Sequence, residues 1–155
     1  MKKIVSFREL KTTAGLIGNK KKVLLGGCFD LLHFGHLTLL KNAKREGNFM
    51  IIALESDEFI KMRKKRNPIH SQEQRAEILA SINTVDLVVK LPFLKSDEEY
   101  FQLVRLIKPS VIAITQGDKQ TENKNRQAGL VGARLAIVTN LIKGFSTKKI
   151  IKALG

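Results

Sequence analysis

Five short runs of apolar residues recur along this chain of 155 residues. They are KVLLGG at 22–27, FMIIAL at 49–54, VDLVVKL at 85–91, SVIAIT at 110–115 and RLAIVT at 134–139. Within each run the apolar residues are nearly continuous and do not alternate with polar ones. This pattern is typical of strands that are buried on both faces of a parallel sheet.

The segments between these runs carry apolar residues at helical spacing. Three such sets are Leu37, Leu40 and Ala43, then Ile78, Leu79 and Ile82, and finally Phe101, Val104 and Ile107. The second set follows Ser71 with Glu73 and Gln74, the pattern of a capping box at a helix start. Strands and helices therefore alternate, which predicts an α/β fold: a doubly wound, Rossmann-like parallel sheet with helices on both faces.

One domain is expected over residues 1–155, because the sequence has no internal repeat, low-complexity tract or shift of composition. Residues 1–21 precede the first long apolar run. Within them VSFRELKTTAGLI at 5–17 reads as a short leading helix that packs beside the sheet. The sequence assigns no function to this leading segment.

Charge restricts the partners. Lys and Arg total 28 against 14 Asp and Glu, a net charge of +14. Such a charge attracts anions, and a nucleic acid, an anionic membrane surface and a polyphosphate metabolite all satisfy it. The basic clusters are NKKKV at 19–23, KMRKKR at 61–66 and KKIIK at 148–152. None is interleaved with the aromatic residues of a base-stacking surface, so nucleic-acid binding is not favoured.

The single cysteine, Cys28, excludes an intrachain disulfide framework and a four-thiolate zinc site. It therefore favours a reducing compartment. The longest apolar runs, such as the one at 49–54, fall far short of the ~18 residues of a membrane span, and the N-terminus lacks the apolar core of a signal peptide. We expect a cytoplasmic protein without a membrane segment.

The chemistry concentrates where the first long run ends, in GGCFDLLHFGH at 26–36. In an open α/β sheet, ligands bind at the carboxyl ends of strands, where helix N-termini offer free N–H groups to phosphates. Gly27 allows the backbone to approach a ligand closely, and Gly35 leaves room for a nucleotide at the helix start. His33 and His36 are three residues apart, so both can reach the same phosphate.

Other interpretations of the histidines are weaker. A zinc site needs three or four ligands, but apart from His33 and His36 the chain offers only His70 and Cys28 as soft ones, so metal ligation is not expected. A P-loop is excluded because neither GxxxxGKS nor GxxxxGKT occurs. Either histidine alone would read as a helix cap or a core residue, and it is the pair around a glycine that favours phosphate binding.

This stretch resembles the HxGH signature of the nucleotidyltransferase superfamily, in its cytidylyltransferase-like family. The motif itself is HFGH at 33–36. Five further segments resemble the family in order and spacing: KIVSFREL at 3–10, AKREG at 43–47, ESDEF at 55–59, RNPIHSQEQRAEILASINTVDLVV at 66–89 and GFSTKKII at 144–151. They are similar to segments of glycerol-3-phosphate cytidylyltransferases and of heptose-1-phosphate adenylyltransferase domains.

The resemblance implies an enzyme that transfers AMP or CMP from ATP or CTP to a phosphorylated small molecule and releases pyrophosphate. A sugar phosphate is the favoured acceptor, with glycerol-3-phosphate cytidylyl transfer and FMN adenylyl transfer as alternatives. The resemblance also implies Mg²⁺ that accompanies the nucleotide, held largely by phosphates and water, and a homodimer as an option. The alternative of another class is a non-catalytic protein that binds anions or nucleic acid with the same fold.

Particular residues acquire roles from the same resemblance. His33, His36 and Lys44 are the catalytic candidates. Nucleotide binding is expected of Gly27, Cys28, Phe29, Gly35, Gly117, Asp118, Phe145, Ser146 and Thr147. Contact with the acceptor or with a phosphate is expected of Asp30, Arg75 and Lys143.

Three positions depart from the family pattern. Lys143 stands where many relatives have an arginine shortly before the Ser-Thr pair, and Lys119 follows Asp118 where an aromatic residue is usual. Asn67 is inserted before Pro68. The first two departures bear on the acceptor and on the choice of base.

Overall fold

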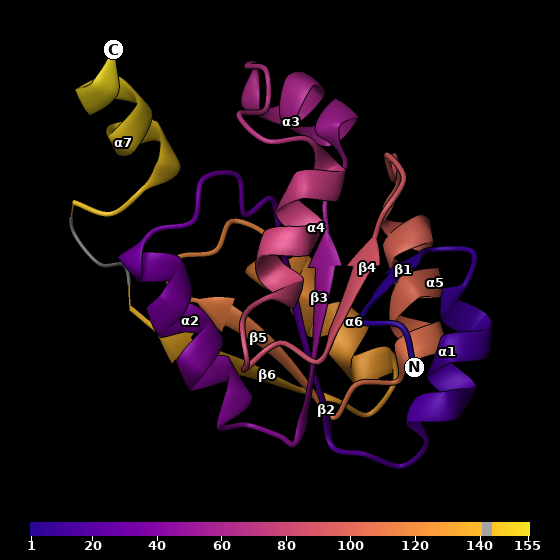
Figure 1. The fold of residues 1–155 in the computed structure, drawn as a ribbon. Coiled ribbons are helices and arrows are strands. Elements are labelled where there is room, and N and C mark those ends of the chain that lie inside the picture. The colour runs from indigo at the N-terminus through magenta and orange to yellow at the C-terminus, as the bar shows by residue number, and fades with distance from the viewer. Residues whose placement is uncertain (141–143) are drawn as a thin grey trace.

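The fold is a parallel sheet with helices on both faces (Figure 1). The computed structural model describes residues 1–140 and 144–155. Its strands are β1 (Ile4–Ser6), β2 (Lys22–Gly27), β3 (Phe49–Leu54), β4 (Leu87–Lys90), β5 (Val111–Thr115) and β6 (Arg134–Thr139). They form one sheet in the order β1-β4-β3-β2-β5-β6, and every neighbouring pair is parallel. The predicted Rossmann-like α/β class is confirmed.

The helices lie in two layers. They are α1 (Leu10–Ile17), α2 (Phe34–Lys44), α3 (Asp57–Lys64), α4 (Gln72–Ala80), α5 (Asp97–Ile107), α6 (Thr121–Leu130) and α7 (Thr147–Leu154). Helices α2 and α4 cover one face of the sheet, while α1, α5 and α6 cover the other (Figure 1). Helix α7 stands at the margin of the molecule, and none of its residues is buried. No helix in the described ranges is long and apolar enough to cross a membrane.

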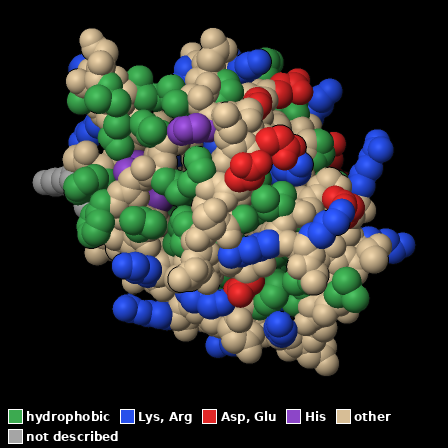
Figure 2. All heavy atoms as spheres, in the orientation of Figure 1, with side chains coloured by type: hydrophobic (Ala, Val, Ile, Leu, Met, Phe, Trp, Pro, Cys, Tyr) green, Lys and Arg blue, Asp and Glu red, His purple; other side chains and the backbone are tan. Residues whose placement is uncertain are grey.

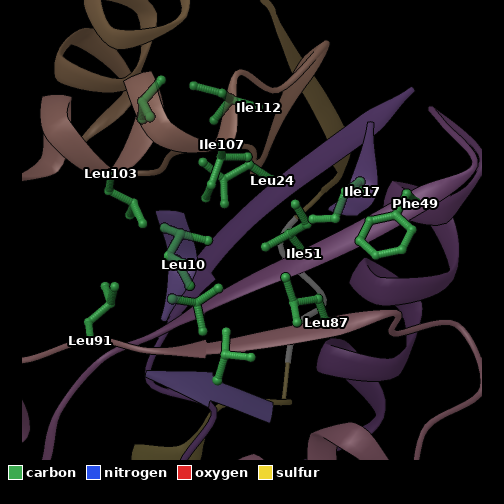
Figure 3. Packing of buried hydrophobic residues seen from close by; sticks show 14 of the residues in the cluster. Leu10, Ile17, Leu24, Phe49, Ile51, Leu87, Leu91, Leu103, Ile107 and Ile112 are labelled. Atoms are coloured by element: carbon green, nitrogen blue, oxygen red, sulfur yellow. The ribbon is translucent and has the colours of Figure 1, made fainter. Parts of the chain in front are cut away.

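Each face of the sheet has its own hydrophobic core. In β2, Leu24 belongs to the core beneath α1 and α5, whereas Val23 and Leu25 belong to the core beneath α2 and α4. Figure 3 shows the first of these cores, to which the strands contribute Leu24 and Ile51 and α5 contributes Leu103. Every residue of β3 is buried. The continuous apolar runs arise because neither side of a central strand faces solvent.

The leading segment differs from the single helix that the sequence predicted. Residues Ile4–Ser6 form β1, which pairs with the outer edge of β4. The helix begins only at Leu10, after Glu9 accepts hydrogen bonds of 2.7 Å from both the N–H and the hydroxyl of Ser6. A strand of 3 residues is too short to give a readable pattern, so the sequence indicated a helix from Val5 onward.

Two helices, α3 and α6, were absent from the sequence prediction. Ile60 is the one buried residue of α3, and α6 buries only Gln127 and Ala128. Such narrow apolar faces give no helical periodicity that can be read against the many charged and polar neighbours. The start of α3 still carries a readable cap, because the side chain of Ser56 accepts a hydrogen bond of 3.0 Å from the N–H of Phe59.

The predicted capping box at the start of α4 is confirmed. The N–H of Gln74 donates to the hydroxyl of Ser71 at 3.3 Å, and the N–H of Ser71 donates to the side chain of Gln74 at 3.0 Å. Strand β4 is shorter than its apolar run. Its run includes Asp86, whose carboxylate accepts a 2.6 Å hydrogen bond from the N–H of Met50 and so stands outside the ladder.

The topology has a switch point at β2. This strand is flanked by β3 and β5, and the helices that follow β2 and β5 lie on opposite faces of the sheet. At such a point the loops after the two strands diverge and leave a crevice at their carboxyl ends. The motif HFGH at 33–36 ends the loop after β2 and opens α2, so fold and motif meet at this edge.

Candidate active site

Two cavities adjoin at the carboxyl edge of the sheet. The smaller, of about 220 Å³ and named the histidine cavity here, is lined by Gly26, Gly27, Cys28, Phe29, His33, Gly35, His36, Leu39, Thr115, Thr139, Asn140 and Phe145. The larger, of about 1230 Å³ and named the deep cavity, is lined by the sheet edge and by residues of α3, α5, α6 and α7. Residues 26–29 and His36 line both cavities, so the end of β2 is their shared wall.

The loop between β2 and α2, residues 28–33, contains two residues with left-handed backbones that are not glycine. The φ angle is +47° at Phe29 and +72° at Leu31. Such conformations cost about 1 to 3 kcal/mol each, and they persist only where the surroundings enforce them. Gly27 is part of this enforced shape, because a Cβ there would lie 2.9 Å from the ring of Phe29.

Asp30 holds the loop in place. Its carboxylate accepts hydrogen bonds from the N–H groups of Ile69 at 2.9 Å and His70 at 3.0 Å, and from the guanidinium of Arg66 at 2.5 Å. Burial opposes ionisation of this side chain, but the hydrogen bonds from His70, Ile69 and Arg66 outweigh it and hold the pKa of Asp30 below its usual value. Asp30 is 1% exposed and lines the deep cavity, so the structure gives it the role of holding the loop, and its contact with the acceptor or a phosphate stays a prediction.

Arg75, a residue of α4, also holds the loop between β2 and α2 in place. Its side chain is 0% exposed. It donates to the carbonyls of Cys28 at 2.6 Å and Glu55 at 2.9 Å, to the carbonyl of His70 at 3.1 Å, and to the carboxylate of Asp57 at 2.7 Å. The prediction that Arg75 contacts the acceptor or the triphosphate is therefore corrected: its donors fasten the ends of β2 and β3 to α4.

The paired histidines are fixed by the start of α2. His33 is the N-cap residue, and its N–H donates to Nδ1 of His36 at 3.3 Å. The reciprocal contact of a capping box, from the N–H of His36 to the ring of His33, is too loose to satisfy Nδ1 of His33, which is buried without a partner. The two rings stack with their centroids 3.8 Å apart. Both side chains line the histidine cavity.

This geometry determines the charge and the tautomer of the histidines. Burial, with a smaller contribution from the neighbouring ring, lowers the pKa of His36 from 6.5 to about 4. Burial also lowers the pKa of His33. His36 is therefore neutral near pH 7, and because its Nδ1 accepts a hydrogen bond, the proton resides on Nε2. Nε2 of His36 is thus a hydrogen-bond donor for a ligand.

Gly35 and Phe145 lie against the same histidine. A Cβ on Gly35 would meet the ring of His33 at 2.9 Å and Cβ of Phe145 at 3.6 Å. The His33 ring thus lies against Gly35, which lines the histidine cavity, and room for a nucleotide at this glycine stays a prediction. Phe145 lines the histidine cavity and packs on Phe34, with ring centroids 5.5 Å apart.

The start of α7 joins the loop after β2. Ser146 is its N-cap and accepts a hydrogen bond of 3.1 Å from the N–H of Lys149. Thr147 lines the deep cavity, but its hydroxyl donates to the carbonyl of Asp30 at 3.1 Å. The side chains of Ser146 and Thr147 thus place the helix end. Lys143, the third predicted residue of this segment, lies outside the described residues.

The loop after β5 reaches the deep cavity through a turn. Gly117 has a φ of +78°, a conformation that favours glycine. Asp118 lines the cavity, and its carboxylate accepts hydrogen bonds from the N–H of Gln120 at 2.7 Å and from the ammonium of Lys124 at 2.6 Å. The structure therefore brings Asp118 to the site as the residue that orders the start of α6.

Lys44 does not join the site. It is the last residue of α2, about 12 Å along the helix axis from His36 by the rise of an α-helix. Its ammonium pairs with Asp86 and donates to the carbonyl of Asn48 at 3.2 Å, both near the amino-terminal edge of the sheet. The prediction that Lys44 adds charge at the triphosphate is wrong, because the helix carries it away from the cavity.

Glu55 and Tyr100 belong to the deep cavity, although the sequence did not single them out. Glu55 follows β3 and is 8% exposed. Its Oε1 accepts a hydrogen bond of 2.7 Å from the hydroxyl of Tyr100, while Oε2 is buried without a partner. Burial raises the pKa of Glu55 from 4.5 to about 7. The sequence signal that could have identified Glu55 is its position as a charged residue directly after a buried strand, because such a fold binds ligands at strand ends.

Cys28 lines both cavities but is a poor nucleophile. Burial raises the pKa of its thiol to about 11, so the thiolate is scarce near pH 7. The backbone of this residue matters more, since its carbonyl accepts the 2.6 Å hydrogen bond from Arg75. Cys28 therefore shapes the wall between the cavities.

Cationic side chains border the deep cavity. They are Arg63, Lys64, Arg66, Lys95, Lys119, Lys124 and Lys148. Two of them are paired, Arg66 with Asp30 and Lys124 with Asp118, and the other five form no ion pair with any residue that the structure describes. Figure 2 shows the histidine side chains among hydrophobic ones on one face, with Lys and Arg placed around them. This setting favours a polyanion beside the histidines.

Metal ligands do not gather in the same way. Within residues 1–140 and 144–155, no three His, Cys, Asp or Glu side chains lie together as a metal-binding group.

Known proteins resemble this chain in sequence. Residues 24–153 match the cytidylyltransferase-like family. A bifunctional protein HldE from Aliarcobacter butzleri is 36% identical over 157 residues, which cover 97% of this chain and 31% of that protein. The chain thus spans about a third of the length of the HldE proteins that it matches. An FAD synthase from Pyrococcus horikoshii is 38% identical over 120 residues, which cover 77% of this chain and 79% of that enzyme.

Solved structures share the fold at lower identity. A lipopolysaccharide core biosynthesis protein from Thermoplasma volcanium superimposes with a TM-score of 0.64 at 22% identity, covering 82% of this chain and 100% of that one. A pantoate-beta-alanine ligase from Francisella tularensis gives a TM-score of 0.68 at 15% identity, covering 98% of this chain and 77% of that one. At these identities the likeness concerns the fold alone.

The doubly wound sheet and the paired histidines at its switch point define the class: a Rossmann-like fold with a candidate nucleotide site at the carboxyl ends of its strands. The sequence matches then give the family. This chain belongs to the cytidylyltransferase-like family of nucleotidyltransferases. The resemblance that HFGH and its flanking segments predicted is confirmed.

Proposed function

We propose that this chain transfers a nucleoside monophosphate from ATP or CTP to a phosphorylated small molecule. An oxygen of the acceptor phosphate forms a bond to the α-phosphorus of the nucleotide. The bond from that phosphorus to the oxygen bridging it to the β-phosphate breaks, and pyrophosphate leaves with the electron pair. The observation that carries this proposal is the neutral His36, which presents an Nε2 donor at the start of α2 beside the histidine cavity.

The residues of the site suit this reaction because it needs positioning and charge stabilisation rather than a covalent intermediate. The first N–H groups of α2 have no partners within the helix, so they are available to phosphate oxygens. Nε2 of His36 adds a preorganised donor. The unpaired cations at the deep cavity, such as Lys119 and Lys148, add positive charge where a triphosphate and an acceptor phosphate would meet.

Mg²⁺ is part of the proposal as a companion of the nucleotide. It would offset negative charge on the phosphates when bound there. The chain contributes its cations and helix ends, and the phosphate oxygens supply most of the metal ligands, in keeping with the lack of a ligand cluster among the described residues.

Adenylyl transfer to a sugar 1-phosphate is our preferred form of this reaction. The segment KIVSFREL at 3–10 supports it through its resemblance to heptose-1-phosphate adenylyltransferase domains, and the similarity to bifunctional HldE proteins spans the same segment. Glycerol-3-phosphate cytidylyl transfer is the first alternative. The similarity to an FAD synthase keeps adenylyl transfer to FMN as the second.

A homodimer in the cytoplasm completes the proposal. The unpaired thiol of Cys28 supports a reducing compartment. Light scattering of the purified chain measures the assembly directly.

The rival function is non-catalytic binding of nucleic acid through the net charge of +14. The histidine pair and the cavities favour the enzyme, because a surface that binds nucleic acid by charge needs neither.

The test incubates the purified chain with ATP or CTP, Mg²⁺ and a panel of phosphate esters, and follows pyrophosphate release. We expect turnover with one nucleotide and at least one ester. No pyrophosphate with any combination, together with salt-sensitive RNA binding, would contradict the proposed function.

A further inference from the structure

Glu55 lines the deep cavity, and one of its carboxylate oxygens is buried beside it without a hydrogen-bond partner among the described residues. The residue follows β3, and its backbone is fixed from two sides. Its N–H donates to the carbonyl of Gly27 at 3.0 Å, and its carbonyl accepts from Arg75 at 2.9 Å. One carboxylate oxygen accepts a hydrogen bond of 2.7 Å from Tyr100, and the other has no hydrogen-bond partner among residues 1–140 and 144–155. Burying such an oxygen without a partner is unfavourable, so a ligand that satisfies it gains affinity.

A hydroxyl is the group that suits this oxygen best. Burial raises the pKa of Glu55 to about 7, so its ionised and neutral forms are both populated near neutral pH. A hydroxyl donates to the ionised carboxylate and accepts from the neutral acid, so it pairs with either form. A phosphate would be repelled by the ionised form.

The charges around Glu55 argue against an ammonium group as the partner. Arg75 of α4, Arg63 of α3 and Lys124 of α6 all act on the carboxyl, and each is positive. A ligand ammonium would be placed among these cations, whereas a hydroxyl is neutral. Tyr100 of α5 fills the remaining side with its hydroxyl.

We propose that Glu55 selects a hydroxylated acceptor, by pairing its free carboxylate oxygen with a hydroxyl on the carbon skeleton of a polyol or sugar phosphate. This inference rests on the proposed function for the assignment of the deep cavity to the acceptor. The acceptor phosphate then lies toward the unpaired cations, and the hydroxylated carbons lie toward Glu55 and Tyr100. The cavity volume of about 1230 Å³ leaves room for both the acceptor and part of the nucleotide.

The test measures dissociation constants by calorimetry in the presence of a non-hydrolysable ATP analogue. The probes are propyl phosphate, 2-aminoethyl phosphate, glycerol 3-phosphate, glucose 1-phosphate and mannose 1-phosphate. With the wild-type chain, we expect the best hydroxylated ester to bind at least about tenfold more tightly than propyl phosphate, the effect of one hydrogen bond to a charged group. We expect 2-aminoethyl phosphate to bind no better than propyl phosphate.

Variants of Glu55 test whether its carboxyl causes the tighter binding of the hydroxylated ester. Glu55→Leu removes the acceptor atom at similar size, and the hydroxylated ester should then bind within about threefold of propyl phosphate. Glu55→Gln keeps the hydrogen bond from Tyr100 through its amide oxygen and loses only the free carboxylate oxygen. The hydroxylated ester should therefore lose part of its gain in affinity over propyl phosphate. This variant also provides a test if the leucine variant misfolds. Glu46→Leu is the matched control, because Glu46 pairs with Arg134 at the opposite edge of the sheet, and it should keep the full gain.

The inference is overturned if no hydroxylated ester binds more tightly than propyl phosphate, or if the gain in affinity survives in both Glu55 variants. Tighter binding of 2-aminoethyl phosphate would overturn it as well. Pyrophosphate release in the same samples reports on the proposed function separately. Turnover without a dependence on Glu55 leaves the function and removes this inference, whereas a Glu55-dependent gain without turnover leaves the binding site and removes the transfer reaction.

Discussion

His36 is the residue on which the proposed chemistry depends most directly. Its backbone position makes it part of the first turn of α2, and its Nδ1 is occupied by the N–H of His33. The helix start thus fixes the ring, its tautomer and its neutral state at once. A sequence pattern identified the pair, but only the hydrogen bond shows which nitrogen is left for a ligand.

Replacing His36 by Ala should lower kcat for pyrophosphate release about 100- to 1000-fold, the usual effect of losing one preorganised donor. The fold should persist, because the ring is only half-buried. Steady-state kinetics and circular dichroism measure both effects. Lys44→Ala is the control, because the family resemblance made Lys44 a catalytic candidate but the structure pairs it with Asp86 outside the cavity. Its kcat should stay within about threefold of wild type.

The pKa shifts of His36 and Glu55 act on stability in opposite directions. The pKa of His36 falls from 6.5 to about 4 on folding, so its contribution is complete above pH 6.5 and is lost as the pH drops toward 4. The pKa of Glu55 rises from 4.5 to about 7, so its contribution is complete below pH 4.5 and is lost as the pH rises toward 7. Each pKa shift changes the free energy of unfolding by up to roughly 3 kcal/mol across its pH range, and the two changes partly cancel in the wild type.

Urea unfolding of His36→Gln and Glu55→Gln between pH 4 and 7.5 checks these signs. Relative to wild type, His36→Gln should become more stable as the pH falls below 6.5, and Glu55→Gln should become less stable. Neighbouring groups also influence both pKa values, so each variant must be compared with wild type at every pH. Glu55 is influenced by Tyr100, Lys124, Arg75 and Arg63, and His36 by His33. Parallel profiles for both variants would contradict the two assigned shifts.

At the scale of elements, the site depends on how α2 and α4 meet the loop after β2. Helix α2 supplies the histidines, and α4 supplies Arg75, whose donors hold the carbonyls of Cys28 and Glu55. The left-handed residues Phe29 and Leu31 show that this loop is enforced from outside. Helices α2 and α4 therefore hold the strained loop between β2 and α2 in its conformation.

Gly35→Ala should separate activity from stability in α2. The added Cβ would press on the His33 ring at 2.9 Å, so kcat should fall about tenfold or more as the ring pair moves. Alanine favours the helix by about 1 kcal/mol, which offsets part of the strain in the free energy of unfolding. In Gly15→Ala of α1, where nothing lies within 4 Å of the new Cβ, stability should rise with unchanged kcat. Equal kcat values for the two variants would contradict the role given to the His33 ring.

Arg75→Leu should destabilise the protein by roughly 3 to 5 kcal/mol, since it strands buried carbonyls and the carboxylate of Asp57. Urea unfolding measures this loss. Arg75→Lys should recover little of it, because an ammonium does not reproduce the fork of donors. The exposed pair of Arg105 with Glu98 offers the control: Arg105→Leu should cost under about 1 kcal/mol. A mild effect of Arg75→Leu would mean that the loop does not need this clamp.

At the scale of the whole molecule, the excess of positive charge acts on ligand capture. The net charge is +14, and seven cationic side chains border the deep cavity. Long-range attraction of this kind weakens as salt shortens the Debye length, whereas short hydrogen bonds inside the site are screened much less.

The affinity for ATP should therefore fall as NaCl rises from 50 to 300 mM, measured as Kd by calorimetry. Lys148→Gln, at the mouth of the deep cavity, should weaken ATP binding about two- to tenfold at low salt and should reduce the salt dependence. Lys21→Gln is the control, because this exposed lysine lies at the amino-terminal edge of the sheet, and it should change the Kd by less than about twofold. Equal effects of the two variants would show that net charge matters and its position does not.

The sequence by itself determined the frame of this protein. Apolar runs such as 22–27 and 49–54 are strands in the structure over the same residues, because a central parallel strand needs apolar residues on both faces. The motif HFGH also located the site, since fold class and motif together place it at a strand end. Weak local signals failed: β1 is too short, and the faces of α3 and α6 are too polar.

Only the tertiary structure decided which polar residues are already engaged with other parts of the chain. Lys44, Arg75 and Asp30 follow the family pattern, yet the structure turns the first toward Asp86 and buries the other two in hydrogen bonds. Glu55 and Tyr100 lie far apart in the sequence and meet through their 2.7 Å hydrogen bond. The reason is physical: burial and partner atoms decide whether a polar group is free, and both arise from contacts between distant segments of the chain.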